Sequence, residues 1–474
     1  MNRKLLIVIL VALVPVFFAA FPSGDYVILG WNDLGMHCAN KNNSKFTILP
    51  PYNNLMVQVI KRGDANNMPH IVTGDYKVTY EVPGNTYSVG KTDFWTYANA
   101  LYGVTLAPNI GFSGAGLSGD MDTLGTHFQK KGIPITAYPD TDLITEHPYQ
   151  LALMKAYDVN NNLLAETQNV IPVSSEINCV SSGCHSSEQN VLNSHESVSG
   201  FNANGPNRCS KCHPDNASPG PNTGSEQSLS YVIHYRHRNL TSDCYKCHPG
   251  PNTQCYRDAM FNLGYTCQSC HGTMANIAST IQAGRQPWLQ EPTCFTATCH
   301  NANHAQETGK LYRESKGHGG LYCSACHGSP HAIVPTNQPN DNLQNMSLQG
   351  FAGKLMDCTV CHGVNPTMPG PHGALAIGIN PIAGGTPSRN GFSTIYPNPV
   401  TDGKTQLILE IKTSGNYRIV IIDMAGKQIA ILAHRDFNTG TYRLDLNTSS
   451  FAKGAYLASL TGSNVRDVKK FIVE

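Results

Sequence analysis

The sequence lacks the features that would point to nucleic acid or a membrane as a partner. Its 33 lysines and arginines nearly balance 32 aspartates and glutamates, so the formal net charge is only +1. No electric field of one sign therefore favours a nucleic acid or an anionic membrane surface. Beyond the N-terminus the chain also lacks any apolar run long enough to span a bilayer.

The N-terminus has the pattern of a targeting segment. Arg3 and Lys4 precede an apolar stretch over residues 5–18, and polar residues begin at Ser23. This stretch is too short for a comfortable membrane span but matches the apolar core of a signal peptide. We therefore predict a signal peptide over residues 1–23, with an uncleaved anchor as the alternative, and expect the mature protein outside the cytoplasm.

Cysteine is nearly absent from both ends of the chain. Of 16 cysteines, only Cys38 precedes Cys179, and none follows Cys361. A chain of 474 residues can build its own hydrophobic cores and does not need disulfides in the way that a small secreted domain does. The cysteines that are concentrated in residues 179–373 therefore call for a chemical explanation.

Seven cysteine pairs in this segment are each followed directly by a histidine. Five read C-x-x-C-H and two have the longer form C-x-x-x-x-C-H. Two thiols a short loop apart can form thioether bonds to the two vinyl groups of one haem, and the next imidazole then binds the iron as proximal ligand. In chain order, the first to seventh motifs are Cys179, Cys184 and His185; Cys209, Cys212 and His213; Cys244, Cys247 and His248; Cys267, Cys270 and His271; Cys294, Cys299 and His300; Cys323, Cys326 and His327; Cys358, Cys361 and His362.

Structural zinc and disulfides are the alternatives for these cysteines. Zinc sites also use recurring C-x-x-C pairs, and an oxidising compartment permits disulfides. Neither requires a histidine directly after the second cysteine. We therefore predict about seven covalently attached haem c groups, and keep a disulfide as the alternative for the two longer motifs.

The supply of further histidines matches the number of motifs. Seven remain in the segment, which permits a distal imidazole on every iron, although the spacing assigns none of them to an individual haem. A surface role stays the alternative for one or two of these residues. The candidate distal ligands are His195, His234, His237, His304, His318, His331 and His372.

The same segment has little regular apolar patterning and is rich in Gly, Pro, Asn and Ser. Its residues are too few to wrap seven rings separately, so we expect the rings to share walls and to replace the missing core. Without haem the segment is expected not to fold stably. Cys38 and Cys255 fit no motif; a mutual disulfide, and metal binding by Met36, His37 and Cys38, are both open.

Residues 176–373 resemble the multihaem c-type cytochromes on the strength of these motifs. The resemblance implies electron transfer, a fold with little regular secondary structure, and irons that often carry two histidines. Paired imidazoles lack the thioether ligand that raises cytochrome c potentials, so comparatively low potentials are expected. Residues 30–38 (GWNDLGMHC) also resemble N-terminal regions of some multihaem cytochromes.

The C-terminal residues 394–474 resemble the sorting domain of the bacterial type IX secretion system. The resemblance implies a β-sandwich that the outer-membrane secretion machinery recognises, followed by cleavage and attachment to the cell surface or release. A carbohydrate-binding or adhesive sandwich is the alternative. The matching segments are YPNP at 396–399, DMAGK at 423–427, GTY at 440–442, GAY at 454–456 and KKFIV at 469–473.

The remaining parts complete a multidomain organisation. Residues 24–175 are predicted to form a mostly β domain of unknown role, because short β-rich runs recur and a turn-rich cluster at 158–162 reads as a hairpin connection. Residues 374–393 are rich in Gly, Pro and Ala and are predicted to be a linker.

Two functions are compatible with this organisation. The first is conduction of electrons between redox partner proteins or extracellular donors and acceptors, with self-assembly into a larger wire left open. The second is a multihaem oxidoreductase acting on a small nitrogen or sulfur compound, which needs one iron with an open face. No motif ends in lysine and the histidines suffice to close every iron. Conduction is therefore favoured, and no catalytic residue is predicted.

Overall fold

The computed structural model describes most of residues 24–474 and shows a mostly β protein, with 32% strand and 19% helix. The predicted signal peptide, Cys299, His300, His304, His372 and most of the predicted linker lie outside the described residues. The positions that are not described are 1–23, 200, 219–225, 251, 295–306, 351, 365, 367–378, 383–388, 402 and 463–464.

Two five-stranded sheets form the N-terminal region, in the orders β1-β4-β9-β8, with β5 also on β4, and β2-β11-β10-β6-β7. The helix α1 (Phe94–Tyr102) connects β6 to β7. The first sheet consists of β1 (Tyr26–Trp31), β4 (Asn53–Lys61), β5 (His70–Val72), β8 (Asp122–Leu124) and β9 (His127–Ile133). The second consists of β2 (His37–Cys38), β6 (Lys77–Glu81), β7 (Ser118–Asp120), β10 (Tyr149–Tyr157) and β11 (Leu163–Ser174).

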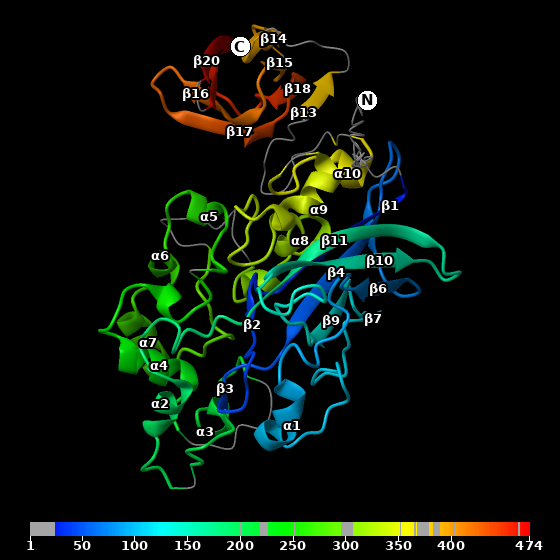
Figure 1. Cartoon of the computed structure of the whole chain (residues 1–474). Helices are drawn as coiled ribbons and strands as arrows, with labels where there is room; N and C mark the ends of the chain where they lie inside the picture. Colours follow the sequence, from blue (N-terminus) through cyan, green and yellow to red (C-terminus); the bar gives the residue numbers. More distant parts are fainter. Residues whose placement is uncertain are drawn as a thin grey trace, which may run out of the picture.

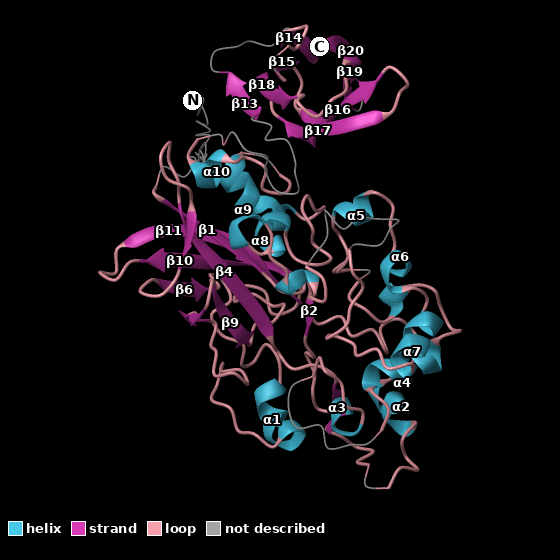
Figure 2. Ribbon diagram, turned by 180° about the vertical axis from the view of Figure 1, so that it is seen from behind, coloured by secondary structure: helices cyan, strands magenta, loops and turns pink. Residues whose placement is uncertain are grey.

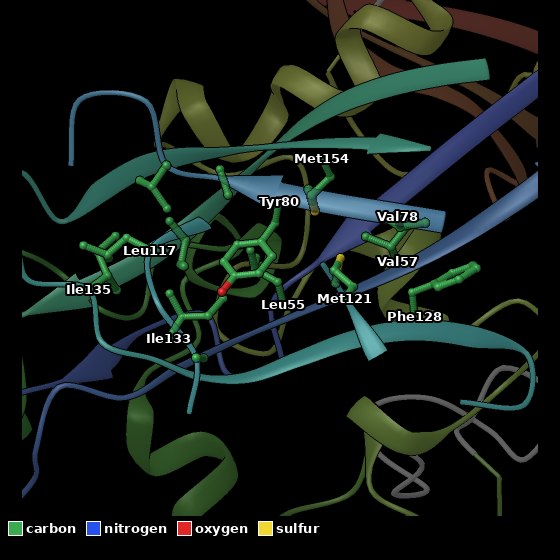
Figure 3. Close-up of a cluster of buried hydrophobic side chains, with 14 of the residues drawn as sticks. Leu55, Val57, Val78, Tyr80, Leu117, Met121, Phe128, Ile133, Ile135 and Met154 are labelled. Carbon is green, nitrogen blue, oxygen red and sulfur yellow. The ribbon is translucent and has the colours of Figure 1, made fainter. Parts of the chain in front are cut away.

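Alternating side chains of both sheets build a core between them (Figure 3). On β6, Val78 and Tyr80 point inward between exposed Lys77 and Glu81, as expected for a strand with one buried face. The predicted hairpin is confirmed, because β10 pairs with β11 in antiparallel fashion across residues 158–162.

The outer face of the first sheet is covered as well. Met56 and Ile60 of β4 point away from the main core and pack with Ala325, Leu348 and Val360. These last three residues belong to the Cys-His segment, so that segment lies directly against the β region.

The Cys-His segment consists of short helices joined by long loops, beside the two sheets (Figures 1 and 2). Two residues each from β3 (Phe46–Thr47) and β12 (Asn207–Arg208) pair to join it to the N-terminal region. Its helices are α2 (Glu188–Asn193), α3 (Cys209–Cys212), α4 (Leu229–His237), η1 (Cys244–Lys246), α5 (Ala259–Asn262), α6 (Cys267–His271), α7 (Met274–Gln282), η3 (Tyr312–Glu314), η4 (His318–Gly320), α8 (Cys323–His327), α9 (Pro339–Gln349) and α10 (Thr359–His362).

The C-terminal region is a second pair of sheets, each with four strands, in the orders β13-β18-β15-β14 and β17-β16-β19-β20. Its core is formed by inward side chains such as Leu407, Leu409 and Ile419, which are fully buried. The strands are β13 (Ile379–Ile382), β14 (Gly391–Tyr396), β15 (Lys404–Ile411), β16 (Gly415–Asp423), β17 (Gln428–Phe437), β18 (Gly440–Asn447), β19 (Gly454–Gly462) and β20 (Val465–Val473).

Candidate cofactor sites

A cavity of about 3460 Å³ runs through the Cys-His segment, and residues of the β region and of the C-terminal sandwich, such as Met36, Ile60 and Leu432, also line it. Close-packed protein interiors hold few voids larger than a water molecule, and a pocket for one small ligand is typically about 300–1,000 Å³. Every described cysteine and histidine of the seven motifs lines this cavity, and so do all five described distal candidates. The space therefore has the size and the lining for several large cofactors rather than one.

Most of the shorter motifs fold into a single helical turn. The turn brings the histidine amide back to the carbonyl oxygen of the first cysteine, with N–O distances of 3.1 Å in the second motif, 2.9 Å in the third and 2.9 Å in the seventh. The two sulfurs and the imidazole thus project from one short turn, as attachment to a single ring requires.

The first of the two longer motifs closes in the same way. The His185 amide donates to the Cys179 carbonyl oxygen at 3.0 Å, although four residues separate the two cysteines instead of two. The extra residues form a turn in which Gly183 has a φ of +79°. The longer loop therefore presents its histidine much as the shorter loops do.

Among the described residues, five motif histidines each face one distal candidate across the cavity. Two imidazoles that bind one metal ion from opposite sides hold their ring centres about 6 Å apart, because each metal–nitrogen bond is about 2 Å long and the rings add the rest. The ring-centre distances are 6.3 Å for His185–His237, 6.3 Å for His213–His195, 6.2 Å for His248–His234, 6.0 Å for His271–His331 and 5.9 Å for His362–His318.

Hydrogen bonds fix the orientation of several of these rings. The Nδ1–H groups of His213, His234 and His237 donate to backbone carbonyl oxygens at 2.8, 2.7 and 2.8 Å. A carbonyl oxygen can only accept, so Nδ1 carries the proton and Nε2 keeps its lone pair. His185 and His195 make equivalent Nδ1 contacts with Asn190 Oδ1 and Ser194 Oγ. This is the arrangement by which proteins orient metal-binding histidines.

Burial favours the neutral form of several of the facing imidazoles. It lowers the pKa of His248 to about 4, with a further contribution from His234, and it lowers the pKa of His331 to about 4. Burial also lowers the pKa values of His234 and His271. A neutral imidazole is the form that binds a metal ion, so the environment favours ligation.

The zinc alternative would need a different grouping of side chains from the facing pairs. Structural zinc takes four ligands in a tetrahedron. Within the residues that the structure describes, no three His, Cys, Asp or Glu side chains gather closely enough to hold a metal ion. Each facing pair brings together two imidazoles, not the four side chains that a structural zinc site uses.

Shared elements join the motifs into one row. Helix α4 carries the partners of the first and third motifs, His237 and His234, one turn apart. Helix α2 lies between His185 of the first motif and His195, which faces the second motif. The second, first and third motifs are therefore neighbours in that order.

The row continues through the later motifs. The third motif meets the fourth where the side chains of Cys244 and Cys267 contact each other. His331, the partner of the fourth motif, follows the histidine of the sixth by four residues. The Leu355 amide, just before the seventh motif, donates to the Cys326 carbonyl oxygen at 2.9 Å. The order in space thus differs from the order in the chain.

Sequence spacing alone does not find these pairings. His331 lies near His327 in the chain but faces His271, and His318 precedes the sixth motif but faces the seventh. The one useful local signal is the spacing of His234 and His237, three residues apart on one helix. His300, His304 and His372 lie outside the described residues, so the fifth motif stays a sequence prediction.

The Met36, His37 and Cys38 cluster is arranged differently. His37 is buried, and its Nε2 lies 2.8 Å from Asp33 Oδ1, while Asn54 donates to Asp33 Oδ2 at 2.7 Å. The imidazole is thus held by a carboxylate inside the β region. No group of three metal-binding side chains forms there among the described residues.

The C-terminal sandwich has the fold expected of the predicted sorting domain. Residues 394–474 match the family model of the secretion system C-terminal sorting domain. The resemblance seen in the sequence is confirmed for this segment. The sorting domain indicates secretion to the cell surface or the extracellular space. No curated protein matches the chain.

The helices give no sign of a membrane span. Across the ranges that the structure describes, none is both long enough and apolar enough to cross a bilayer. The sorting domain is thus the part of the chain whose cellular role the comparisons establish.

Proposed function

We propose that this protein is a secreted multihaem c-type cytochrome that conducts electrons between redox partners at or beyond the cell surface. The observation that carries the proposal is the set of five facing histidine pairs inside one large cavity, each pair joining a motif histidine to a distal candidate. The sorting domain supports the location.

The chain's own residues would do three things for haem c. The paired cysteines would hold each ring by thioether bonds. The facing imidazoles, with their Nδ1 protons tied to carbonyl oxygens, would grip the iron through Nε2 and fix the ring planes. The apolar side chains that line the cavity, such as Leu192, Val334 and Leu355, would contact the ring faces. Haem c itself supplies a one-electron couple between ferric and ferrous iron.

The facing histidine pairs favour conduction over the reductase alternative, because each pair would occupy both faces of one iron. An enzyme acting on a small nitrogen or sulfur compound needs an iron with a vacant face. Five of the seven motif histidines have a second imidazole opposite them, and the neighbouring pairs share helices or contacting cysteines. A row of neighbouring sites, five of which would be closed on both faces by imidazoles, suits transfer between outside partners, with extracellular acceptors or a further copy of the chain as the receiving side.

Haem content and spin state test the proposal. Pyridine haemochrome analysis of the matured protein is expected to give about seven haems per chain, and electron paramagnetic resonance is expected to give low-spin signals without carbon monoxide binding. A high-spin fraction that binds carbon monoxide in the unmodified protein would favour the reductase instead.

One variant sharpens this test. His237→Ala removes the partner of the first motif and is expected to convert one of the haems to a high-spin form that binds carbon monoxide, with the haem count unchanged. His147, whose side chain is 52% exposed and which lies apart from the cavity lining, offers the matched control. His147→Ala is expected to leave the spectra unchanged.

A further inference from the structure

Two cysteines belong to no Cys-His motif, and the structure brings them to the same place. Cys38 ends β2 and is followed by alanine, and Cys255 lies in the loop before α5 and is followed by tyrosine. Both are half-buried thiols in this structure, and both line the cavity. They come from the β region and from the Cys-His segment respectively, 217 positions apart in the chain.

Hydrogen bonds on the N-terminal side of Cys255 hold its loop against the β region. Cys38 pairs with Ser174 of β11, and Ser174 Oγ lies 3.2 Å from Thr253 Oγ1. The Thr253 amide donates to Glu176 Oε2 at 2.9 Å, and Tyr149 Oη donates to the Gln254 carbonyl oxygen at 3.0 Å.

A buried cation holds the other side of the loop. Arg257 Nη1 donates to the Gly35 carbonyl oxygen at 2.8 Å and to the Cys255 carbonyl oxygen at 3.1 Å. One guanidinium thus joins the backbone just before Cys38 to the backbone of Cys255. Residues 252–257, which we call the strap, are therefore fixed to the β region on both sides of the cysteine.

We propose that Cys38 and Cys255 form a disulfide that fastens the strap to β2. The bracketing contacts keep the two backbones close, as a disulfide requires, since its Cα atoms lie about 4.4–6.8 Å apart. The sorting domain supports an oxidising compartment, where disulfides form and persist. The thioether bonds predicted for the other 14 cysteines would leave these two as the remaining thiols.

Forming the disulfide removes two electrons and two protons from Cys38 and Cys255. A protein disulfide of a thiol oxidase accepts both by thiol–disulfide exchange. One thiolate attacks that disulfide, and the second thiolate then displaces the oxidase from the mixed disulfide. One S–S bond forms in this chain, the oxidase disulfide is reduced to two thiols, and the two protons pass to those thiols.

The environment indicates when this exchange occurs. Burial and the neighbouring Cys255 raise the pKa of Cys38, and burial raises the pKa of Cys255 to about 12. Such thiols are poor nucleophiles and poor metal ligands once they are enclosed. In the folded chain the strap is also fixed to the β region by hydrogen bonds and both thiols are half-buried, so we place the exchange during folding.

Peptide mapping of the matured, haem-loaded chain tests the bond directly. The protein is unfolded and alkylated, with and without prior reduction, and then digested. We expect a linked peptide pair containing Cys38 and Cys255 without reductant, and both cysteines alkylated after reduction. Alkylation of both before reduction would overturn the proposal. Thioether bonds resist the reductant, and the readout names the two peptides, so the result does not depend on the number of haems.

Stability measurements provide a second readout. Cys38→Ser, Cys255→Ser and the double variant are each expected to lower the denaturation midpoint by the same amount, because each removes the same bond. Reductant is expected to lower the midpoint of the unmodified protein to that level and to leave the variants unchanged. Additive losses in the double variant, or an equal response of all four proteins to reductant, would contradict the disulfide.

Discussion

The two sheets of the N-terminal region and the Cys-His segment beside them are filled in opposite ways. Between the sheets, side chains such as Leu55, Val57 and Phe128 are at most 1% exposed and leave no room for a ligand. In the Cys-His segment the helices are short, and a cavity of about 3460 Å³ lies where a core would be.

This difference shows what fills the interior of each region. A strand with alternating apolar residues carries its half of the core in its own sequence. The Cys-His segment carries predicted attachment points instead of core residues, and the motif residues that the structure describes line the cavity. Its folding free energy should therefore depend on a bound cofactor, whereas that of the β region should not.

The largest expected effect comes from withholding haem. If the chain is produced without haem-attachment machinery, residues 179–364 are expected to lose their structure, while the paired sheets over residues 24–174 keep theirs. Limited proteolysis with mass spectrometry should then show early cleavages confined to the Cys-His segment. If both regions of the haem-free protein resisted proteolysis equally, the Cys-His segment would not depend on haem for its fold.

The next largest effect is expected at a buried ion pair of the Cys-His segment, where this segment packs against the β region. Arg257 binds Asp341 through two contacts of 2.7 and 2.8 Å, and the two side chains are only 2% and 5% exposed. Arg257→Met leaves the Asp341 charge buried and unpaired, which is expected to cost about 3–5 kcal/mol. Chemical denaturation of the haem-loaded protein measures this loss.

The exposed pair Lys77–Asp120 serves as the control for that change. Its atoms are 3.3 Å apart, and its side chains are 47% and 67% exposed. Asp120→Asn is expected to change the free energy of unfolding by less than about 1 kcal/mol. A loss as large as that of Arg257→Met would mean that burial does not explain the difference.

Shortening a side chain in the core between the two N-terminal sheets is expected to destabilise that region and to leave the Cys-His segment unchanged. Leu55 is fully buried, and Leu55→Ala is expected to cost about 2–5 kcal/mol because it removes apolar contacts and leaves a cavity. The haem content and the low-spin spectra should remain those of the unmodified protein. Leu163→Ala, at a β11 side chain that is 52% exposed, offers the control with little expected loss.

The sequence predicts the β regions better than the arrangement of the sites. Alternation along residues 76–82 and the turn at 158–162 anticipate β6 and the β10–β11 hairpin because these signals are local. The motifs likewise name the attachment residues. The pairing of His271 with His331 depends on how distant loops fold around a shared cavity, and no local pattern records it.

The sequence also does not predict helix α1 or the position of the GWNDLGMHC segment. The residues of α1 are aromatic-rich, and Phe94 and Tyr102 pack against Phe112, a contact that only the tertiary fold provides. Gly35 of the GWNDLGMHC segment receives a hydrogen bond from Arg257 of the distant strap. Its role in joining the two regions becomes visible only when both are folded.

The smallest expected effect is a pH dependence inside the β region, at Asp33. Burial raises the pKa of this carboxyl, but the charge of His37 and hydrogen bonds from His37 and Asn54 outweigh burial and lower the pKa below its usual value. The ionised form is thus favoured by folding. Its contribution to stability is present above the unfolded pKa of about 3.9 and is lost as the pH falls through the lower folded value.

The variant Asp33→Asn measures how much the ionised carboxylate contributes to the free energy of unfolding. At pH 7 the variant is expected to be less stable by about 1.5–3 kcal/mol, since it loses hydrogen bonds to a charged group. The gap between the two proteins should begin to narrow below about pH 4, where the unfolded carboxylate takes up a proton, and should close as the pH falls through the lower folded pKa. Denaturation midpoints at pH 7, 5 and 3 measure the gap, with the haem spectra recorded in parallel. If the gap instead widened in acid, or if the spectra changed with it, Asp33 would act through the cavity rather than within the β region, and the two regions would not be as independent as their interiors suggest.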